Sequence, residues 1–174
     1  MSLVNIIMAE HSRAQAVMIA DIILQKPSLL DELVDIILAD EEPVSRRAAW
    51  PLRFIHEKNE KLTDKYLPKI ISSLPDIKSV AIQRNLLYVI AYSSIPQSYK
   101  GELLEYTSQI LLNSSSAVAP IIYSIDIFLK ISKDEPDLLN ELELIIEHLI
   151  PNATAGVLSK SRHTLRKINK LKSH

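Results

Sequence analysis

Histidine is the side chain best suited to acid–base or metal chemistry near neutral pH, and the spacing of the histidines in this sequence predicts neither. The five are His11, His56, His148, His163 and His174. No two are three or four residues apart, as two metal ligands on one helix face must be. His56 and Glu57 begin like a zinc-protease motif that lacks its second histidine. Because the chain has no cysteine, sulfur-based zinc sites and thiolate nucleophiles are excluded as well.

Nucleotide and acyl-transfer chemistry are also poorly supported. The only two glycines, Gly101 and Gly156, cannot build a phosphate-cradling loop, which needs several glycines at fixed spacing. No segment resembles the strand–turn–helix that presents a nucleophilic serine. We therefore expect no catalytic residue, no cofactor and no metal, and hence a protein that is not an enzyme.

Basic residues are the remaining candidates for a functional surface. They are Arg46, Arg47, Arg53, Lys61, Lys65, Lys69 and Arg84 in the middle of the chain, and Arg162 and Arg166 near its end. Lys61, Lys65 and Lys69 are four residues apart and share one face of a helix. Such a strip could contact phosphate or an acidic protein, although the same spacing is common on solvated helix faces. The basic end is open to the same two interpretations, a polar cap or a binding helix.

Charge is distributed in blocks along the chain, although the net charge is only −1. Residues 1–42 carry −6, residues 43–100 carry +6, residues 101–147 carry −7 and residues 148–174 carry +6. The small net charge argues against a general polyanion binder. If helices stack in chain order, these blocks become neighbouring bands of charge.

Helices must position these residues, because apolar side chains recur at helical spacing nearly everywhere and alternating runs are nearly absent. Proline-containing breakers separate the helical segments. The pattern predicts helices over 10–25, 28–39, 43–58, 62–74, 77–94, 98–113, 116–132, 137–150 and 155–171. The longest apolar stretch is interrupted by Pro120 and Asp126 and is too short to cross a membrane.

The helical segments repeat along the chain. Residues 29–37 align with residues 62–70 at an offset of 33, and Ser12-Arg13 aligns with Ser45-Arg46 at the same offset. Helix pairs of this length cannot bury their apolar faces alone and must stack on one another.

These repeats resemble the HEAT and armadillo-like family of α-helical repeats. Residues 44–55 resemble a HEAT first helix with a proline, Pro51, part-way along it, and Pro120 is placed similarly in a later helix. Residues 66–71 resemble a second helix with Pro68 inside it. The resemblance implies an all-α fold, a right-handed α–α superhelix of about four and a half helix pairs, forming one domain over residues 1–174.

The resemblance also implies a function. The leading expectation is a non-enzymatic protein-interaction module whose partner is another protein, with an acidic segment the best fit. The alternative is a nucleic-acid-binding or DNA-processing module that uses the basic middle and terminal helix, since some DNA glycosylases are HEAT-like. No membrane partner is expected.

Two further points complete the expectations. Residues 72–78 faintly resemble the serine loop of the adenylosuccinate lyase and fumarase superfamily but lack its glycine, methionine and asparagine, so a lyase assignment is unsupported. The first twenty residues lack the basic start of a secretory signal, and we expect a cytoplasmic protein.

Overall fold

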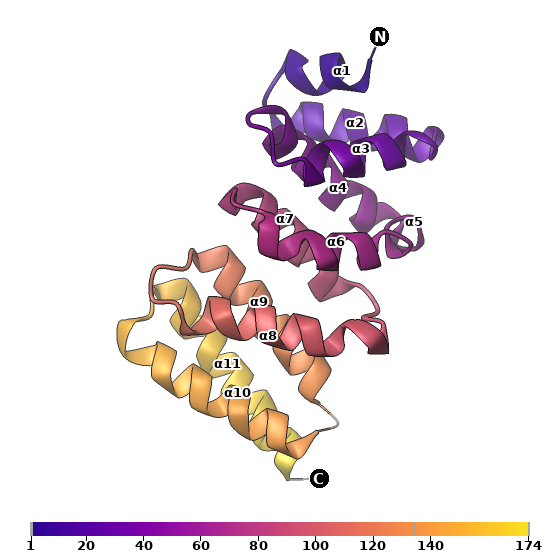
Figure 1. Cartoon of the computed structure of the whole chain (residues 1–174). Helices are drawn as coiled ribbons and strands as arrows, with labels where there is room; N and C mark the ends of the chain where they lie inside the picture. Colours follow the sequence, from indigo (N-terminus) through magenta and orange to yellow (C-terminus); the bar gives the residue numbers. More distant parts are fainter. Residues whose placement is uncertain (1, 134, 174) are drawn as a thin grey trace. The chain divides into compact units, whose positions relative to one another are not determined.

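The computed structural model describes residues 2–133 and 135–173. His174 and Asp134, one of the carboxylates of the second acidic block, lie outside the described residues. The described residues are helical, with no strand among them (Figure 1). The helices are α1 (Leu3–Ala9), α2 (Arg13–Gln25), α3 (Leu29–Leu38), α4 (Val44–Lys58), α5 (Glu60–Asp64), α6 (Leu67–Ser73), α7 (Val80–Tyr92), α8 (Lys100–Leu112), α9 (Val118–Ser132), α10 (Pro136–Leu149) and α11 (Ala155–Lys172). Short 3-10 turns occupy Leu74–Asp76, Gln97–Tyr99 and Ile150–Asn152.

The helices form two compact units, unit 1 (Met1–Ser94) and unit 2 (Ile95–His174). Unit 1 holds α1 to α7 and unit 2 holds α8 to α11. The expectation of one domain over residues 1–174 stays a prediction. Each unit contains one acidic block followed by most of one basic block.

Eight of the nine expected helices are confirmed to within three residues at each end. The ninth, expected over 62–74, is split, because α5 ends at Asp64 and α6 begins at Leu67. Pro68 explains the split: proline has no N–H to continue a helix, but it fits the first turn of a new one. Pro68 therefore lies in the first turn of α6 and not, as expected, in the interior of one helix over 62–74.

The other two prolines differ from each other. Pro51 lies inside α4 and is buried, as expected. Pro120 is only the third residue of α9, where a backbone N–H has no partner within the helix. No helical hydrogen bond is lost at Pro120, so the expectation that it is placed part-way along its helix, as Pro51 is, is wrong.

Helix α1 was not expected from the apolar pattern. Ser2 caps it by accepting a hydrogen bond from the backbone N–H of Asn5 at 3.3 Å. At the other end, Arg47 Nη1 of α4 donates to the carbonyl of Met8 at 3.1 Å. A cation at a helix C-terminus satisfies a free carbonyl and interacts favourably with the helix dipole. Arg47 therefore stabilises the packing of α1 against α4.

In unit 1, α4 packs against α2, α3 and α7, and α3 lies in front of α2 in Figure 1. The core is made of fully buried aliphatic side chains, among them Ile23, Leu33, Leu52, Ile70 and Leu86. These residues hold one face of each helix in place and leave the opposite faces to solvent.

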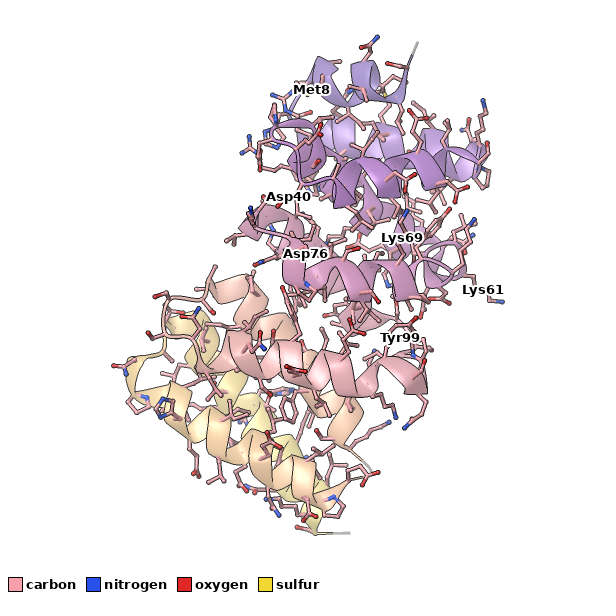
Figure 2. The ribbon with its side chains drawn as sticks, in the orientation of Figure 1. Met8, Asp40, Lys61, Lys69, Asp76 and Tyr99 are labelled. Carbon is pink, nitrogen blue, oxygen red and sulfur yellow. The ribbon has the colours of Figure 1, made fainter. Side chains whose placement is uncertain are left out.

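Two helices of unit 1, α3 and α6, are followed by turns that contain an aspartate. These aspartates, Asp40 and Asp76, lie at the same end of the unit (Figure 2). Asp40 has a φ of 51°, in the left-handed region that aspartate tolerates better than most residues. Its Oδ2 accepts a hydrogen bond from the backbone N–H of Lys78 at 2.7 Å. Asp40 thereby joins the turn after α3 to the segment before α7.

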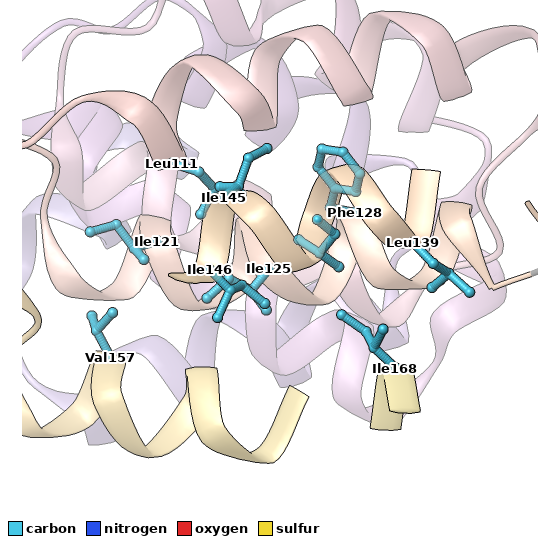
Figure 3. Close-up of a cluster of buried hydrophobic side chains, with 10 residues drawn as sticks. Leu111, Ile121, Ile125, Phe128, Leu139, Ile145, Ile146, Val157 and Ile168 are labelled. Carbon is cyan, nitrogen blue, oxygen red and sulfur yellow. The ribbon is translucent and has the colours of Figure 1, made fainter. Parts of the chain in front are cut away.

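Unit 2 has its own core, drawn in Figure 3, in which α9 packs against α8, α10 and α11. Ile125, Leu142, Ile146 and Ile168 are fully buried there, and Phe128 is 1% exposed. Ile168 is contributed by α11, so the inner face of the basic terminal helix is an integral part of this core.

Candidate interaction surfaces

The lysines of the basic middle lie beside carboxylates of the preceding acidic block. Lys69 on α6 forms an ion pair with Asp35 on α3, and Lys65 Nζ lies 3.8 Å from Asp31 Oδ1. Lys58 at the end of α4 pairs with Asp21 on α2 at 2.5 Å. All of these side chains are at least 44% exposed, so the ion pairs contribute little to stability individually. Together they neutralise much of the strip that the spacing predicted.

Lys61 differs from the other lysines of the strip. It is exposed, and its side chain points away from the ribbon in Figure 2. Within the part of the chain that the structure describes, it forms no ion pair. The predicted row of three lysines therefore contains two paired members and one that is solvated.

The arginines of the basic middle lie in separate environments. Arg46 Nε pairs with Glu42 at 2.9 Å, Arg47 holds α1, and Arg84 on α7 is exposed. Arg53 on α4 contacts Tyr88 on α7, whereas Lys69 on α6 contacts Asp35 on α3. The structure thus distributes the candidates of the basic middle over several surfaces and does not gather them into one site.

Arg53 belongs to a cluster of aromatic and charged side chains on α4 and α7. Its guanidinium lies 4.1 Å from the centre of the Tyr88 ring and donates to Glu57 Oε1 at 2.8 Å. The Tyr88 hydroxyl also donates a hydrogen bond to Glu57 Oε1, at 2.9 Å. The Tyr88 ring lies 4.7 Å from the ring of Tyr92 at a tilt of 42°, and Tyr92 is 55% exposed. Sequence reasoning missed both tyrosines, although their i, i+4 spacing after Arg84 could have indicated them.

The pKa values of this cluster reflect its contacts. Burial alone would raise the pKa of Glu57, but hydrogen bonds from Arg53 and Tyr88 hold it below its ordinary value. Burial, and then the hydrogen bond to Glu57, raise the pKa of Tyr88 to about 12. Both shifts stabilise the charge state that each group already has at neutral pH, so the cluster has the character of a structural contact and not of an acid–base pair.

Trp50 lies nearby on α4 and is half-buried. It meets the ring of His11 edge-on at 6.0 Å and the ring of Phe54 at 6.3 Å, while Arg13 of α2 lies 5.6 Å from the centre of the Phe54 ring. Trp50 therefore joins α4 to the segment before α2.

Helix α11 carries the remaining cations. On its flanks, Lys160 pairs with Asp126 of α9, and Lys172 pairs with Glu143 of α10. Its outer face, which we call the α11 ridge, consists of Arg162, His163, Arg166, Lys167 and Lys170. All five are exposed, and none of their side chains forms an ion pair or hydrogen bond with another described residue. The structure therefore places Arg162 and Arg166, which the sequence singled out, in a continuous cationic surface.

Neither metal binding nor membrane insertion is indicated by the described residues. Among residues 2–133 and 135–173, no three histidine and acidic side chains converge as a metal site requires. Within the same residues, no helix has the length and apolarity needed to cross a membrane.

A family model described as a HEAT repeat domain matches residues 5–168, nearly the whole chain. The chain belongs to the HEAT repeat family. No curated protein and no solved structure matches it. The expected all-α repeat fold is confirmed, and the family supports a repeat scaffold of a generally non-catalytic kind.

The HEAT repeat explains the spacing of two ion pairs in unit 1. Asp31 and Lys65, and Asp35 and Lys69, are each 34 residues apart, close to the repeat offset of 33. Glu42 likewise accepts a hydrogen bond from Ser79 Oγ at 3.0 Å, 37 residues later. Three carboxylates of the first acidic block, Asp31, Asp35 and Glu42, therefore contact lysines or a hydroxyl that follow them by about one repeat.

Proposed function

We propose that this HEAT repeat chain is a non-enzymatic interaction module that binds an acidic segment of another protein through the α11 ridge. The observation that carries the proposal is the contrast between two basic surfaces. Lys58, Lys65 and Lys69 of the basic middle are paired with carboxylates of their own unit, whereas the cations of the ridge have no described side-chain partner. Charge that is not used within the fold is available to a partner.

The ridge fits an acidic helix. Arg162, Arg166 and Lys170 follow one another at four-residue intervals, so their attachment points are about 6 Å apart along α11. Carboxylates at the same intervals on a partner helix have matching spacing. Arginine also presents paired donors that bind a carboxylate bidentately. Since Ile168 and Val157 anchor the opposite face of α11 in the core, the ridge is held in place before a partner arrives.

Nucleic acid is the second candidate, favoured by the same unpaired cations. Proteins that bind single strands combine such charge with aromatic side chains on which bases stack. Helix α11 contains no phenylalanine, tyrosine or tryptophan, and the whole chain carries a net charge of −1. These features favour an acidic protein segment over a nucleic acid. In this proposal the module acts in the cytoplasm and needs no cofactor.

Fluorescence anisotropy tests the proposal with three labelled probes: a helical peptide carrying glutamate at every fourth position, a single-stranded oligonucleotide and a duplex. We expect the peptide to bind, and Arg162→Glu/Arg166→Glu to weaken it by at least about tenfold. The matched control Lys65→Glu/Lys69→Glu makes the same charge change in the basic middle and should leave peptide binding within about twofold. Tighter binding of either nucleic acid than of the peptide, with a steep salt dependence, would replace the proposal with the second candidate.

A further inference from the structure

Helix α2 is apolar on two opposite faces. Its inner face places Ala16, Ile19, Ala20 and Ile23 in the core of unit 1. Its outer face carries Ala14, Val17, Met18 and Ile22, and Met18 is 43% exposed. A helix that is apolar all round is typical of a buried position, yet this outer face lies at the surface of unit 1.

The outer face of α3 shows what a solvated helix of the same unit looks like. There the exposed positions are Asp31, Glu32 and Asp35, and two of these carboxylates hold lysines of the next repeat. The outer apolar row of α2 instead lines a shallow hollow bounded by Arg13 and Asp21. An apolar row with charged ends is typical of a protein contact surface.

We propose that the outer face of α2 is a homodimer interface, in which α2 packs antiparallel against α2 of a second copy about a two-fold axis between Val17 and Met18. In this register Val17 lies opposite Met18 of the partner subunit, and Ala14 lies opposite Asp21 of the partner subunit. Arg13 is then one residue, or about 1.5 Å along the axis, from the level of that Asp21. The two-fold axis produces the Arg13–Asp21 contact twice, once at each end of the apolar row.

Charge decides the occupant and its direction. A parallel arrangement would bring Arg13 against Arg13 and Asp21 against Asp21, which repel. The antiparallel arrangement brings opposite charges together at both ends, so the face is complementary to itself. Both charged groups are also held before docking, because Arg13 lies over Phe54 and Asp21 forms an ion pair with Lys58. Asp21 stays 49% exposed in that pair, so it can accept Arg13 of the partner subunit as a second cation. Holding them in advance reduces the entropy lost on association.

The contact involves little more than one helix of 13 residues on each subunit. Such a contact is at the small end of specific interfaces. We therefore expect a reversible dimer with a dissociation constant on the order of 10–100 µM, corresponding to about 5–7 kcal/mol.

Sedimentation equilibrium of the full chain from about 5 µM to about 1 mM tests the proposal. The wild type should dimerise, and Met18→Glu should weaken dimerisation at least tenfold. Leu144→Glu is the matched control, because Leu144 on α10 is even more exposed, at 66%, and lies outside the proposed interface. A wild type that stays monomeric at 1 mM, or a Met18→Glu variant that dimerises as tightly as the wild type, overturns the proposal.

A charge exchange tests the register independently of the apolar row. Asp21→Arg alone should weaken the dimer, since it places two arginines together at each end, and Arg13→Asp/Asp21→Arg should restore it. Circular dichroism confirms that each variant is folded before it is compared. A double variant that dimerises no better than Asp21→Arg contradicts the antiparallel register. This interface is on unit 1, so its failure would leave peptide binding by the α11 ridge untouched.

Discussion

The hydroxyl of Tyr66 donates a hydrogen bond to Asp31 Oδ1 at 2.6 Å, joining α3 to the residue just before α6 across 35 positions of sequence. Tyr66 is 7% exposed, and burial followed by this hydrogen bond raises its pKa above the ordinary value. Lys65 Nζ lies over the same ring, 4.6 Å from its centre, and 3.8 Å from the same Asp31 oxygen. One aspartate of the first acidic block therefore orients an aromatic side chain and a lysine of the following repeat.

The ion pair between Asp35 and Lys69 should stabilise unit 1 weakly. Lys69→Asp brings two carboxylates together and should lower the free energy of unfolding by about 0.2–1 kcal/mol. The exchanged variant Asp35→Lys/Lys69→Asp should recover most of that loss. Urea unfolding measures all three proteins. If the exchange fails to recover the loss, the stabilisation does not come from the pairing of these two charges.

Ile70 should be far more sensitive than the charges around it. It is fully buried on α6, so Ile70→Ala should leave a cavity and cost about 2–5 kcal/mol. Leu67→Ala, at 2% exposure on the same helix, should cost a similar amount. Leu144→Ala is the exposed control and should cost under about 0.5 kcal/mol. Chemical denaturation giving a loss of less than 0.5 kcal/mol for Ile70→Ala would contradict its place in the core.

Glu57 should make the stability of unit 1 depend on pH in the acid range. Its folded pKa is held below the ordinary value of 4.5, so its contribution is fully present above about pH 5 and is lost as pH falls through the folded value. Glu57→Gln removes this contribution. The stability difference between wild type and variant should therefore shrink from pH 7 to about pH 3. A difference that stays constant over this range would show that the contribution of Glu57 to stability does not depend on its charge.

Tyr88 should have the opposite effect in alkali. Its folded pKa of about 12 exceeds the ordinary value of 10.0, so its contribution is present below about pH 10 and is lost as pH rises towards 12. Tyr88→Phe should remove one late-ionising group from an ultraviolet titration of tyrosine and reduce the alkaline loss of stability. Burial raises the pKa of Tyr106 to about 12 as well, and the pKa of Tyr66 is also raised, so late-ionising tyrosines should remain in the variant. If the amplitude lost in Tyr88→Phe belonged to the tyrosines that ionise near pH 10, the raised pKa of Tyr88 would be contradicted.

The helices were predictable because buried side chains recur every three or four residues over segments of ten residues or more. Helix α1 was missed because seven residues contain only two buried positions, Leu3 and Ile7, too few to show a period. The break between α5 and α6 was missed because a proline inside a helix and a proline that begins one look alike in sequence. The two cases differ only in the backbone at Lys65 and Tyr66, where α5 has ended and α6 has not yet begun.

The candidate surfaces were predictable to a smaller extent. The charge blocks predicted bands of charge. Which acidic residue pairs with which basic residue depends on how the repeats stack, and the repeat offset of 33 indicates that alignment. Arg162 and Arg166 were identified from composition alone. The ridge also includes His163, Lys167 and Lys170, because helix rotation and the flanking pairs of Lys160 and Lys172 decide which cations remain unpaired.

The rate at which the glutamate peptide associates, measured by stopped flow as a function of salt, tests the central claim most directly. For the wild type and for Lys65→Glu/Lys69→Glu, the rate should be similar and should fall as salt rises, because attraction to the ridge accelerates encounter. For Arg162→Glu/Arg166→Glu, the rate should be at least about tenfold lower at low salt and nearly independent of salt, with the melting temperature unchanged. Equal rates for wild type and the ridge variant, or a slow rate only for the basic-middle variant, would contradict the claim that the α11 ridge is the partner-binding surface.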